Sequence, residues 1–134
     1  MSISPLVAVV DDDAAVREAL FDLLLALGLD CRSFCHAEAF LDAYRPDRFD
    51  ALITDIRMPG MGGVELLRRV RVLSPSMPVI VITSIMDPGL HRTVMDHGAR
   101  ASLTKPIAGD DLIHHLQDLG RNGRPPPGYA ESRS

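Results

Sequence analysis

Five residues of the chain carry chemistry that fits the handling of phosphate and a divalent cation. Each follows a short apolar run: Asp11, Asp12, Asp55, Thr83 and Lys105. Three clustered carboxylates repel one another and raise each other's pKa values, and a hard cation relieves that repulsion. Mg²⁺ accepts a few carboxylates, keeps water molecules and leaves positions for phosphate oxygens. An ammonium and a hydroxyl group can hold the remaining phosphoryl oxygens, and a carboxylate can itself act as the nucleophile.

The lysine stands out in a chain that otherwise uses arginine for positive charge. Arginine occurs 13 times and lysine once, at Lys105. Arginine is a planar fork, whereas the lysine ammonium is a compact and movable point charge. Composition bias alone accounts for a single lysine, so its position after an apolar run is what favours a functional role.

Apolar runs and helical stripes alternate along the chain and supply the elements that would position these residues. The runs predict strands at 6–10, 29–34, 51–54, 79–82 and 101–104. Apolar residues with helical spacing predict helices near 16–27, 37–44, 66–73, 89–97 and 112–119. The helix near 89–97 has only a thin stripe of apolar residues along one face. Such alternation is typical of an α/β fold, a doubly wound parallel sheet with helices on both faces. Ligands of such sheets bind beyond the carboxyl ends of the strands.

Several residues have positions that indicate a structural role. Asp13 and His36 are expected to cap helices, and Gly28 fits the position just after a helix. Glycines and a proline predict a loop that includes Gly63, and the arginines at 68, 69 and 71 are expected to form a solvated helix edge. Cys31 and Cys35 are expected to pack as free thiols.

Composition limits the possible functions of this chain of 134 residues. Its length predicts one domain, residues 1–120, followed by a flexible Pro/Gly-rich tail at 121–134. A net charge of −4 argues against binding of nucleic acid or an anionic membrane through this domain. The longest hydrophobic region, residues 20–29, is too short to span a bilayer, and no signal peptide is apparent. The cytoplasm is therefore the expected location.

Four motifs in order resemble the receiver domain of bacterial response regulators: residues 9–13, 54–60, 82–84 and 105–106. The similarity covers about residues 6 to 119. The sequences of residues 37–41 and 63–67 are most similar to those of FixJ-type receivers. The resemblance implies a five-stranded sheet with the order 2-1-3-4-5, an order that general accounts of doubly wound sheets illustrate with a chemotaxis receiver. It implies signalling in two-component systems, with no enzyme activity beyond self-catalysed phosphoryl transfer and autodephosphorylation.

The resemblance also implies a role for each acidic residue. Asp55 would accept a phosphoryl group from a phosphohistidine on a sensor kinase or phosphotransfer protein. Asp12, Asp55 and the backbone carbonyl of Arg57 would bind Mg²⁺ directly, and Asp11 would act mainly through a metal-bound water molecule. The signal would pass to a downstream protein target or a missing output domain, and phosphorylation could drive dimerisation.

The basic and hydroxyl residues have implied roles too. Lys105 would pair with Asp55 and then with the phosphoryl group, and the bond to Pro106 would be cis. Thr83 would turn its hydroxyl group onto a phosphoryl oxygen and report phosphorylation to the surface. Family members usually carry Tyr or Phe where this chain has Ser102, so the usual switch between threonine and an aromatic residue is in doubt.

Three other functions compete with this interpretation. A flavin-binding protein with the same sheet order needs a hydroxyl- and glycine-rich phosphate loop, where this chain has Asp11 to Asp13. A hydrolase of the haloacid dehalogenase type needs an acid two residues after the nucleophile, where Arg57 stands. A receiver-like module that binds partners without phosphorylation remains open because of Ser102, and binding of beryllofluoride would distinguish it.

Overall fold

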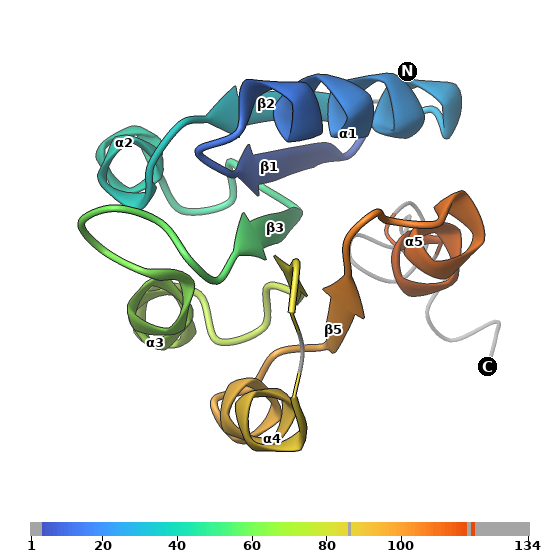
Figure 1. Ribbon diagram of the computed structural model, residues 1–134. Helices are drawn as coiled ribbons and strands as arrows, with labels where there is room; N and C mark the ends of the chain where they lie inside the picture. Colours follow the sequence, from blue (N-terminus) through green and yellow to red (C-terminus); the bar gives the residue numbers. More distant parts are fainter. Residues whose placement is uncertain (1–3, 86, 118, 120–134) are drawn as a thin grey trace, which may run out of the picture.

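The computed structural model, which describes residues 4–85, 87–117 and 119, has a central parallel sheet between two layers of helices (Figure 1). The strands are β1 (Leu6–Val10), β2 (Asp30–Phe34), β3 (Ala51–Asp55), β4 (Val79–Thr83) and β5 (Ala101–Thr104). The helices are α1 (Ala14–Ala26), α2 (Ala37–Ala43), α3 (Gly63–Leu73), α4 (Pro88–Asp96) and α5 (Gly109–Leu116). The sheet order is β2-β1-β3-β4-β5, so the predicted fold class is confirmed.

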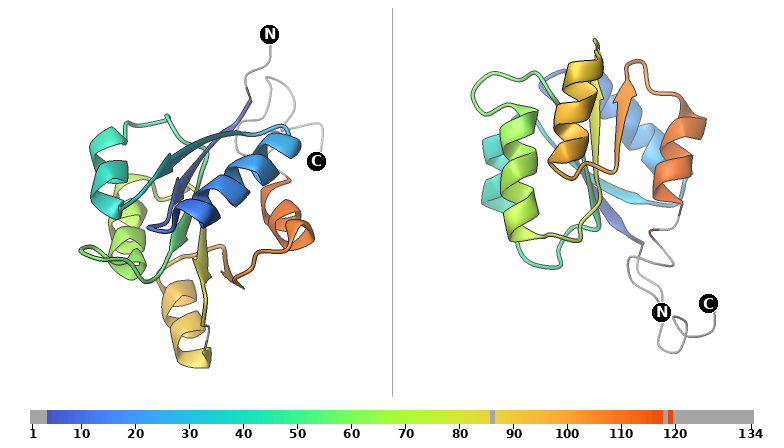
Figure 2. Two further views of the ribbon diagram at one scale, coloured as in Figure 1. Left: turned by 45° about the horizontal axis from the view of Figure 1, so that its top comes forward. Right: turned by 90° about the horizontal axis from the view of Figure 1, so that it is seen from below.

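Residues of the central strands alternate between two separate hydrophobic cores. In β1, Val7 and Val9 pack with α1 and α5, whereas Ala8 and Val10 pack with α2, α3 and α4. Figure 2 shows these two groups of helices on opposite sides of the sheet. Because successive side chains of a strand point to opposite faces, a strand covered on both faces reads as a continuous apolar run.

Local hydrogen bonds confirm the predicted ends of the first two helices. Asp13 Oδ1 accepts a hydrogen bond from the backbone N–H of Ala15 at 2.9 Å. His36 Nδ1 accepts one from the N–H of Ala39 at 3.1 Å, so an imidazole caps α2. Gly28 follows α1 with φ of +81°, a conformation that glycine adopts without strain. Cys31 and Cys35 are free thiols, as expected.

The prediction for Arg71 was wrong. Arg68 and Arg69 are exposed, but the guanidinium of Arg71 is partly buried and donates hydrogen bonds to four backbone carbonyls. Three of these carbonyls belong to the loop between α3 and β4, and the fourth belongs to Gly98 in the turn after α4: Ser74, Pro75, Met77 and Gly98. Arg71 therefore joins two connections on the same edge of the molecule, which helical spacing alone does not reveal.

Helix α4 is the helix with the smallest share in the core. Val94 is its one fully buried residue, in agreement with the thin apolar stripe in its sequence. Asp87 Oδ1 caps the helix by accepting a hydrogen bond from the N–H of Leu90 at 2.8 Å. A helix that buries little apolar surface can shift at low cost in free energy.

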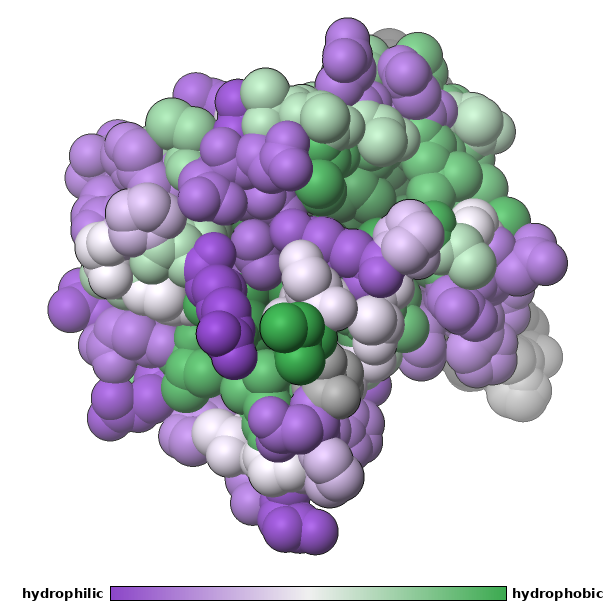
Figure 3. All heavy atoms as spheres, in the orientation of Figure 1, coloured by the Kyte–Doolittle hydropathy of each residue, from purple (hydrophilic) through white to green (hydrophobic). Residues whose placement is uncertain are grey.

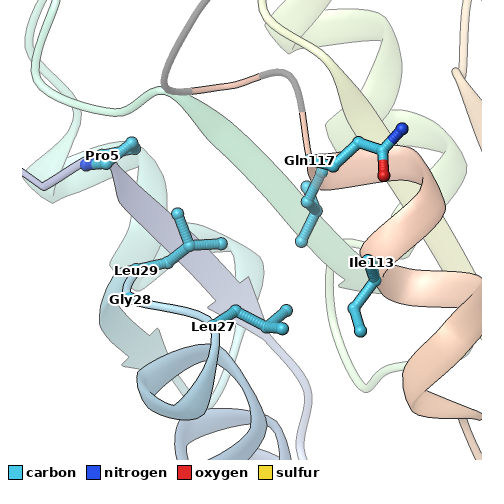
Figure 4. Close-up of a pocket in the computed structure, with 7 residues that line it drawn as sticks. Pro5, Leu27, Gly28, Leu29, Ile113 and Gln117 are labelled. Atoms are coloured by element: carbon cyan, nitrogen blue, oxygen red, sulfur yellow. The ribbon is translucent and has the colours of Figure 1, made fainter.

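A cavity of about 350 Å³ lies between the end of α1 and α5, at the amino ends of the strands (Figure 4). Its lining is Pro5, Leu27, Gly28, Leu29, Ile113, Leu116 and Gln117, which includes no acidic or basic side chain. No helix within the described residues is long and apolar enough to cross a bilayer. The predicted domain boundary at residue 120 and the tail at 121–134 lie outside the described residues.

Candidate functional site

The register of the sheet brings the predicted acidic residues together. Val10 at the end of β1 pairs with Thr54 of β3, so Asp11 and Asp55, which follow them, lie side by side. Asp11 is fully buried and Asp55 is 5% exposed, whereas Asp12 is exposed to solvent. The carboxyl ends of neighbouring parallel strands thus bring together an acidic cluster of Asp11, Asp12 and Asp55, of which Asp12 is exposed to solvent.

Lys105 joins this acidic cluster from the end of β5. Its backbone N–H donates to the carbonyl of Thr83 at 2.8 Å, and the bond to Pro106 is cis, as the resemblance implied. Its Nζ lies 3.0 Å from Asp11 Oδ2 and donates a hydrogen bond to Asp55 Oδ2 at 3.2 Å. Burial alone would lower the pKa of Lys105, but these two carboxylates outweigh it and raise that pKa, so the ammonium stays charged.

Asp11 is the most deeply buried residue of the acidic cluster. Burial raises the pKa of its carboxyl group, and the N–H of Asp13 and the ammonium of Lys105 offset only part of this effect. Oδ1 accepts a hydrogen bond from the N–H of Asp13 at 2.9 Å. Oδ2 is buried and is close enough to Lys105 for an ion pair, but it accepts no hydrogen bond of good geometry. An oxygen with unused acceptor capacity in a buried site can receive a hydrogen bond from a metal-bound water molecule.

The three carboxylates fit a Mg²⁺ ion. Asp11, Asp12 and Asp55 each offer an oxygen, and these atoms lie within 4.8 Å of one another. Oxygens bound to one Mg²⁺ at about 2.1 Å lie about 3 to 4 Å apart, so small side-chain rotations suffice. The N–H of Arg57 donates to Asp55 Oδ1 at 3.4 Å, which keeps the backbone of residue 57 beside the acids. The donor atoms present therefore fit the Mg²⁺ ion that the resemblance implies.

Thr83 lies at the end of β4, but its hydroxyl group is turned to its own loop. The side chain is buried, donates to the carbonyl of Ile85 at 3.1 Å and accepts from the N–H of Ile85 at 3.3 Å. The structure thus brings Asp11, Asp55 and Lys105 into direct contact and leaves Thr83 engaged elsewhere. A contact between Thr83 and a phosphoryl group would require these hydrogen bonds to break.

Ser102 lies on β5 and points its hydroxyl group toward helix α4. Ser102 Oγ and His91 Nδ1 form a hydrogen bond that joins β5 to α4. An aromatic ring at this position would occupy far more volume than a serine side chain. The departure from the family is therefore accompanied by a specific polar contact to α4.

Hydrophilic and apolar surface meet beside Lys105. Figure 3 shows a band of hydrophilic residues across the middle of this face and apolar residues above it, where α1 lies. An apolar hollow of about 250 Å³ lies between α1 and the chain after β5, and Lys105 and Pro106 are part of its wall. The acidic cluster and Lys105 thus lie next to an apolar hollow.

Two residues near the site, Gly63 and Glu38, have structural roles that the sequence did not predict. Gly63 was expected in a loop, but it is the first residue of α3, and a Cβ there would lie 2.2 Å from the carbonyl oxygen of Asp55. A glycine at the start of a strong helical stripe is the signal that could have revealed this close approach. Glu38 on α2 reaches the loop after β3 and accepts a hydrogen bond from the N–H of Met61. No pattern in the sequence predicts the contact between Glu38 and Met61.

Known proteins with the same features are receivers of signalling systems. Residues 7–117 match the family model for the response regulator receiver domain. The chain is 37% identical over 117 residues to the transcriptional regulatory protein FixJ of Bradyrhizobium diazoefficiens. The aligned region covers 87% of this chain and 57% of that protein. It is 41% identical over 117 residues to FixJ of Azorhizobium caulinodans, with 87% and 56% covered.

Comparison of structures agrees with this relationship. The chemotaxis protein CheY4 of Vibrio cholerae has a TM-score of 0.80 and 27% sequence identity, over 87% of this chain and 99% of that one. The chain spans about half the length of the FixJ proteins that it matches. By its family model, its FixJ relatives and its fold, the chain belongs to the response regulator receiver domains of two-component systems and is of the FixJ type.

Proposed function

We propose that Asp55 accepts a phosphoryl group from a phosphohistidine on a sensor kinase or phosphotransfer protein. A carboxylate oxygen of Asp55 forms a bond to phosphorus, and the bond from phosphorus to the imidazole nitrogen breaks, with its electrons leaving on the imidazole. The observation that supports Asp55 is its contact with Lys105 at 3.2 Å within a cluster of three carboxylate oxygens. A nucleophile needs such a cation beside it because negative charge accumulates on the phosphoryl oxygens.

The residues around Asp55 would bind the metal ion and stabilise the phosphoryl group. Asp12, Asp55 and the carbonyl of Arg57 would hold Mg²⁺, which offsets the charge of the carboxylates and the phosphoryl oxygens when it is bound. Asp11 would bind a water molecule of the ion through its unsatisfied oxygen. Lys105 then exchanges its contact with Asp55 for one with a phosphoryl oxygen, which its flexible side chain permits. Attack of water on phosphorus would later break its bond to the carboxylate oxygen, release inorganic phosphate and restore Asp55.

Labelling with a small phosphodonor tests this function. The intact protein is expected to gain the mass of one phosphoryl group when Mg²⁺ is present and none after removal of the ion by EDTA. Asp12→Ala should need far more Mg²⁺ for the same labelling rate. Asp13→Ala is the matched control, because its side chain caps α1 and does not bind the ion.

Two results of that experiment would contradict the proposal. Wild-type protein that gains no phosphoryl group at any Mg²⁺ concentration would point to a module that binds partners without phosphorylation. If Asp12→Ala and Asp13→Ala lost Mg²⁺-dependent labelling equally, Asp12 and Asp13 would not have the different roles of ion ligand and helix cap. Loss of the label over time, with the donor removed, measures the proposed autodephosphorylation.

Phosphorylation should change the surface of α4 rather than that of α5. Thr83 would have to release Ile85 to reach a phosphoryl oxygen, and this movement pulls on the loop that leads into α4. Ser102 is too small to fill space behind Thr83, but its hydrogen bond to His91 connects β5 to α4. A phosphoryl group can shift this equilibrium only by the free energy with which it favours one arrangement.

Beryllofluoride, a mimic of the phosphoryl group, is expected to shift backbone amide resonances of residues 84–97 more than those of residues 107–119. Two-dimensional NMR of the labelled protein with Mg²⁺, before and after addition of beryllofluoride, makes the comparison. Comparable or larger shifts in residues 107–119 would show that the signal leaves by α5. The recipient would be a downstream protein or an output domain, since the FixJ relatives are about twice as long as the matched region.

A further inference from the structure

The loop between β3 and α3 is tied to helix α2 by one carboxylate. This loop begins with Ile56 and ends at Gly62, and it connects the strand of Asp55 to α3. Glu38, the second residue of α2, accepts a hydrogen bond on Oε2 from the backbone N–H of Met61 at 3.2 Å. Among the hydrogen bonds of the described residues, this is the one that ties residues 58–61 to another element.

The loop is shaped to receive this carboxylate. Gly60 has φ of +77°, a left-handed conformation that favours glycine. A Cβ on Gly60 would lie 3.0 Å from Glu38 Oε2, so a larger residue would press against the carboxylate. The backbone N–H groups of Glu38 itself and of Met61 lower the pKa of the Glu38 carboxyl group, so it is ionised at neutral pH.

We propose that Glu38 is a positioning residue for the phosphorylation site. Its carboxylate holds the loop in the conformation that presents the carbonyl of Arg57 toward the ion shared with Asp12 and Asp55. This inference rests on the proposed function of Asp55, and it adds a residue from α2, an element that carries none of the reacting groups.

The argument for an effect on the ion comes from the length of the loop. The two ends of the loop are fixed near Asp55, by the N–H of Arg57 bound to Asp55 Oδ1 and the N–H of Gly63 bound to the carbonyl of Ile56 at 2.9 Å. Between these ends, Met58 and Met61 pack against the hydrophobic core and the ring of Pro59 fixes one backbone angle. Among the described residues, the bond from Met61 to Glu38 is the one hydrogen bond to another element that further limits rotation around Gly60. A carbonyl that rotates freely must be ordered when the ion binds, and this ordering lowers the affinity.

Three variants separate this role from general effects of charge. Glu38→Ala removes the acceptor, whereas Glu38→Gln removes the charge but keeps an oxygen that can accept the hydrogen bond. Glu65→Ala is the matched control, because Glu65 is also on the surface but its carboxylate binds Arg68 and Arg69 at 2.8 and 3.1 Å. Calorimetric titration measures Mg²⁺ affinity, and the labelling rate with a small phosphodonor is measured as a function of Mg²⁺ concentration.

Glu38→Ala is expected to weaken Mg²⁺ binding about 10-fold, at the lower end of the losses seen for residues that support metal ligands. Its labelling rate at saturating Mg²⁺ should stay close to that of the wild type, because the nucleophile and Lys105 are untouched. Glu38→Gln should recover most of the affinity, and Glu65→Ala should have wild-type affinity. A thermal melt of each variant confirms that it is folded.

The possible results are distinguishable from a failure of the proposed function. Wild-type Mg²⁺ affinity in Glu38→Ala would overturn the role of Glu38, and it would leave the assignment of Asp55 intact if the wild type is labelled. Equal losses in Glu38→Gln and Glu38→Ala, or in Glu65→Ala, would show an effect of charge and also overturn it. An unlabelled wild type would contradict the proposed function, while calorimetry would still decide whether Glu38 supports ion binding.

Discussion

Asp55→Asn is expected to lose all phosphoryl labelling while the protein remains folded. The amide nitrogen and oxygen of asparagine are poor nucleophiles, so no acyl phosphate forms at residue 55. Asparagine has nearly the same size as aspartate, so the packing of this 5% exposed side chain is preserved. In the wild type, treatment with hydroxylamine should remove the label, because hydroxylamine cleaves acyl phosphates.

The stability of this variant has an expected sign as well. The charge of Asp55 raises the pKa of Asp11, so removing that charge favours the ionised form of Asp11. Lys105 keeps Asp11 as a partner at 3.0 Å. The free energy of unfolding without Mg²⁺ should therefore not fall, and the gain on adding Mg²⁺ should be smaller than in the wild type. Labelling at the wild-type rate would place the nucleophile elsewhere.

Gly63→Ala is expected to destabilise the protein more than any other single change near the site. Its Cβ would lie 2.2 Å from the carbonyl oxygen of Asp55 and 2.8 Å from Cα of Ile56, and both atoms belong to the backbone. Neither atom can move away by a change of rotamer, so the start of α3 or the end of β3 must shift. Forced shifts of this kind cost about 3 kcal/mol or more. Urea unfolding followed by circular dichroism measures the loss, since the chain has no tryptophan.

The matched control is Gly109→Ala. Gly109 is the first residue of α5, as Gly63 is of α3, but a Cβ there would meet only Leu23 at an ordinary 3.5 Å. Alanine has a higher helix propensity than glycine and restricts the unfolded chain, so this change should be neutral or stabilise by up to about 1 kcal/mol. A loss of equal size in both variants would mean that helix starts, rather than the contact with Asp55, determine the cost.

The sequence predicts the sheet and the acidic cluster well because both follow from the pattern of apolar runs and the residues that end them. Buried strands are continuous apolar runs, and the carboxyl ends of parallel strands meet at one edge, so Asp11, Asp55 and Lys105 could be placed together in advance. Gly63 was misplaced because the contact of a glycine with the backbone of Asp55 leaves no hydrophobic pattern.

The long-range polar contacts were missed for a different reason. Glu38 meets Met61 across 23 residues of sequence, and its helical neighbours suggest only an exposed position. Arg71 was expected to face solvent, because a guanidinium that binds backbone carbonyls has no partner side chain in the sequence. The orientation of Thr83 toward Ile85 also depends on hydrogen bonds that only coordinates reveal.

The contact between Arg71 and the turn after α4 makes two positions depend on each other in any redesign of the chain. Gly98 has φ of +95°, and a Cβ on it would lie 2.7 Å from Cδ of Arg71. The aliphatic stem of the arginine thus occupies the space that any side chain at position 98 would need. Substitution at 98 and retention of Arg71 in its present pose exclude each other, so a mutational library should vary the two positions together.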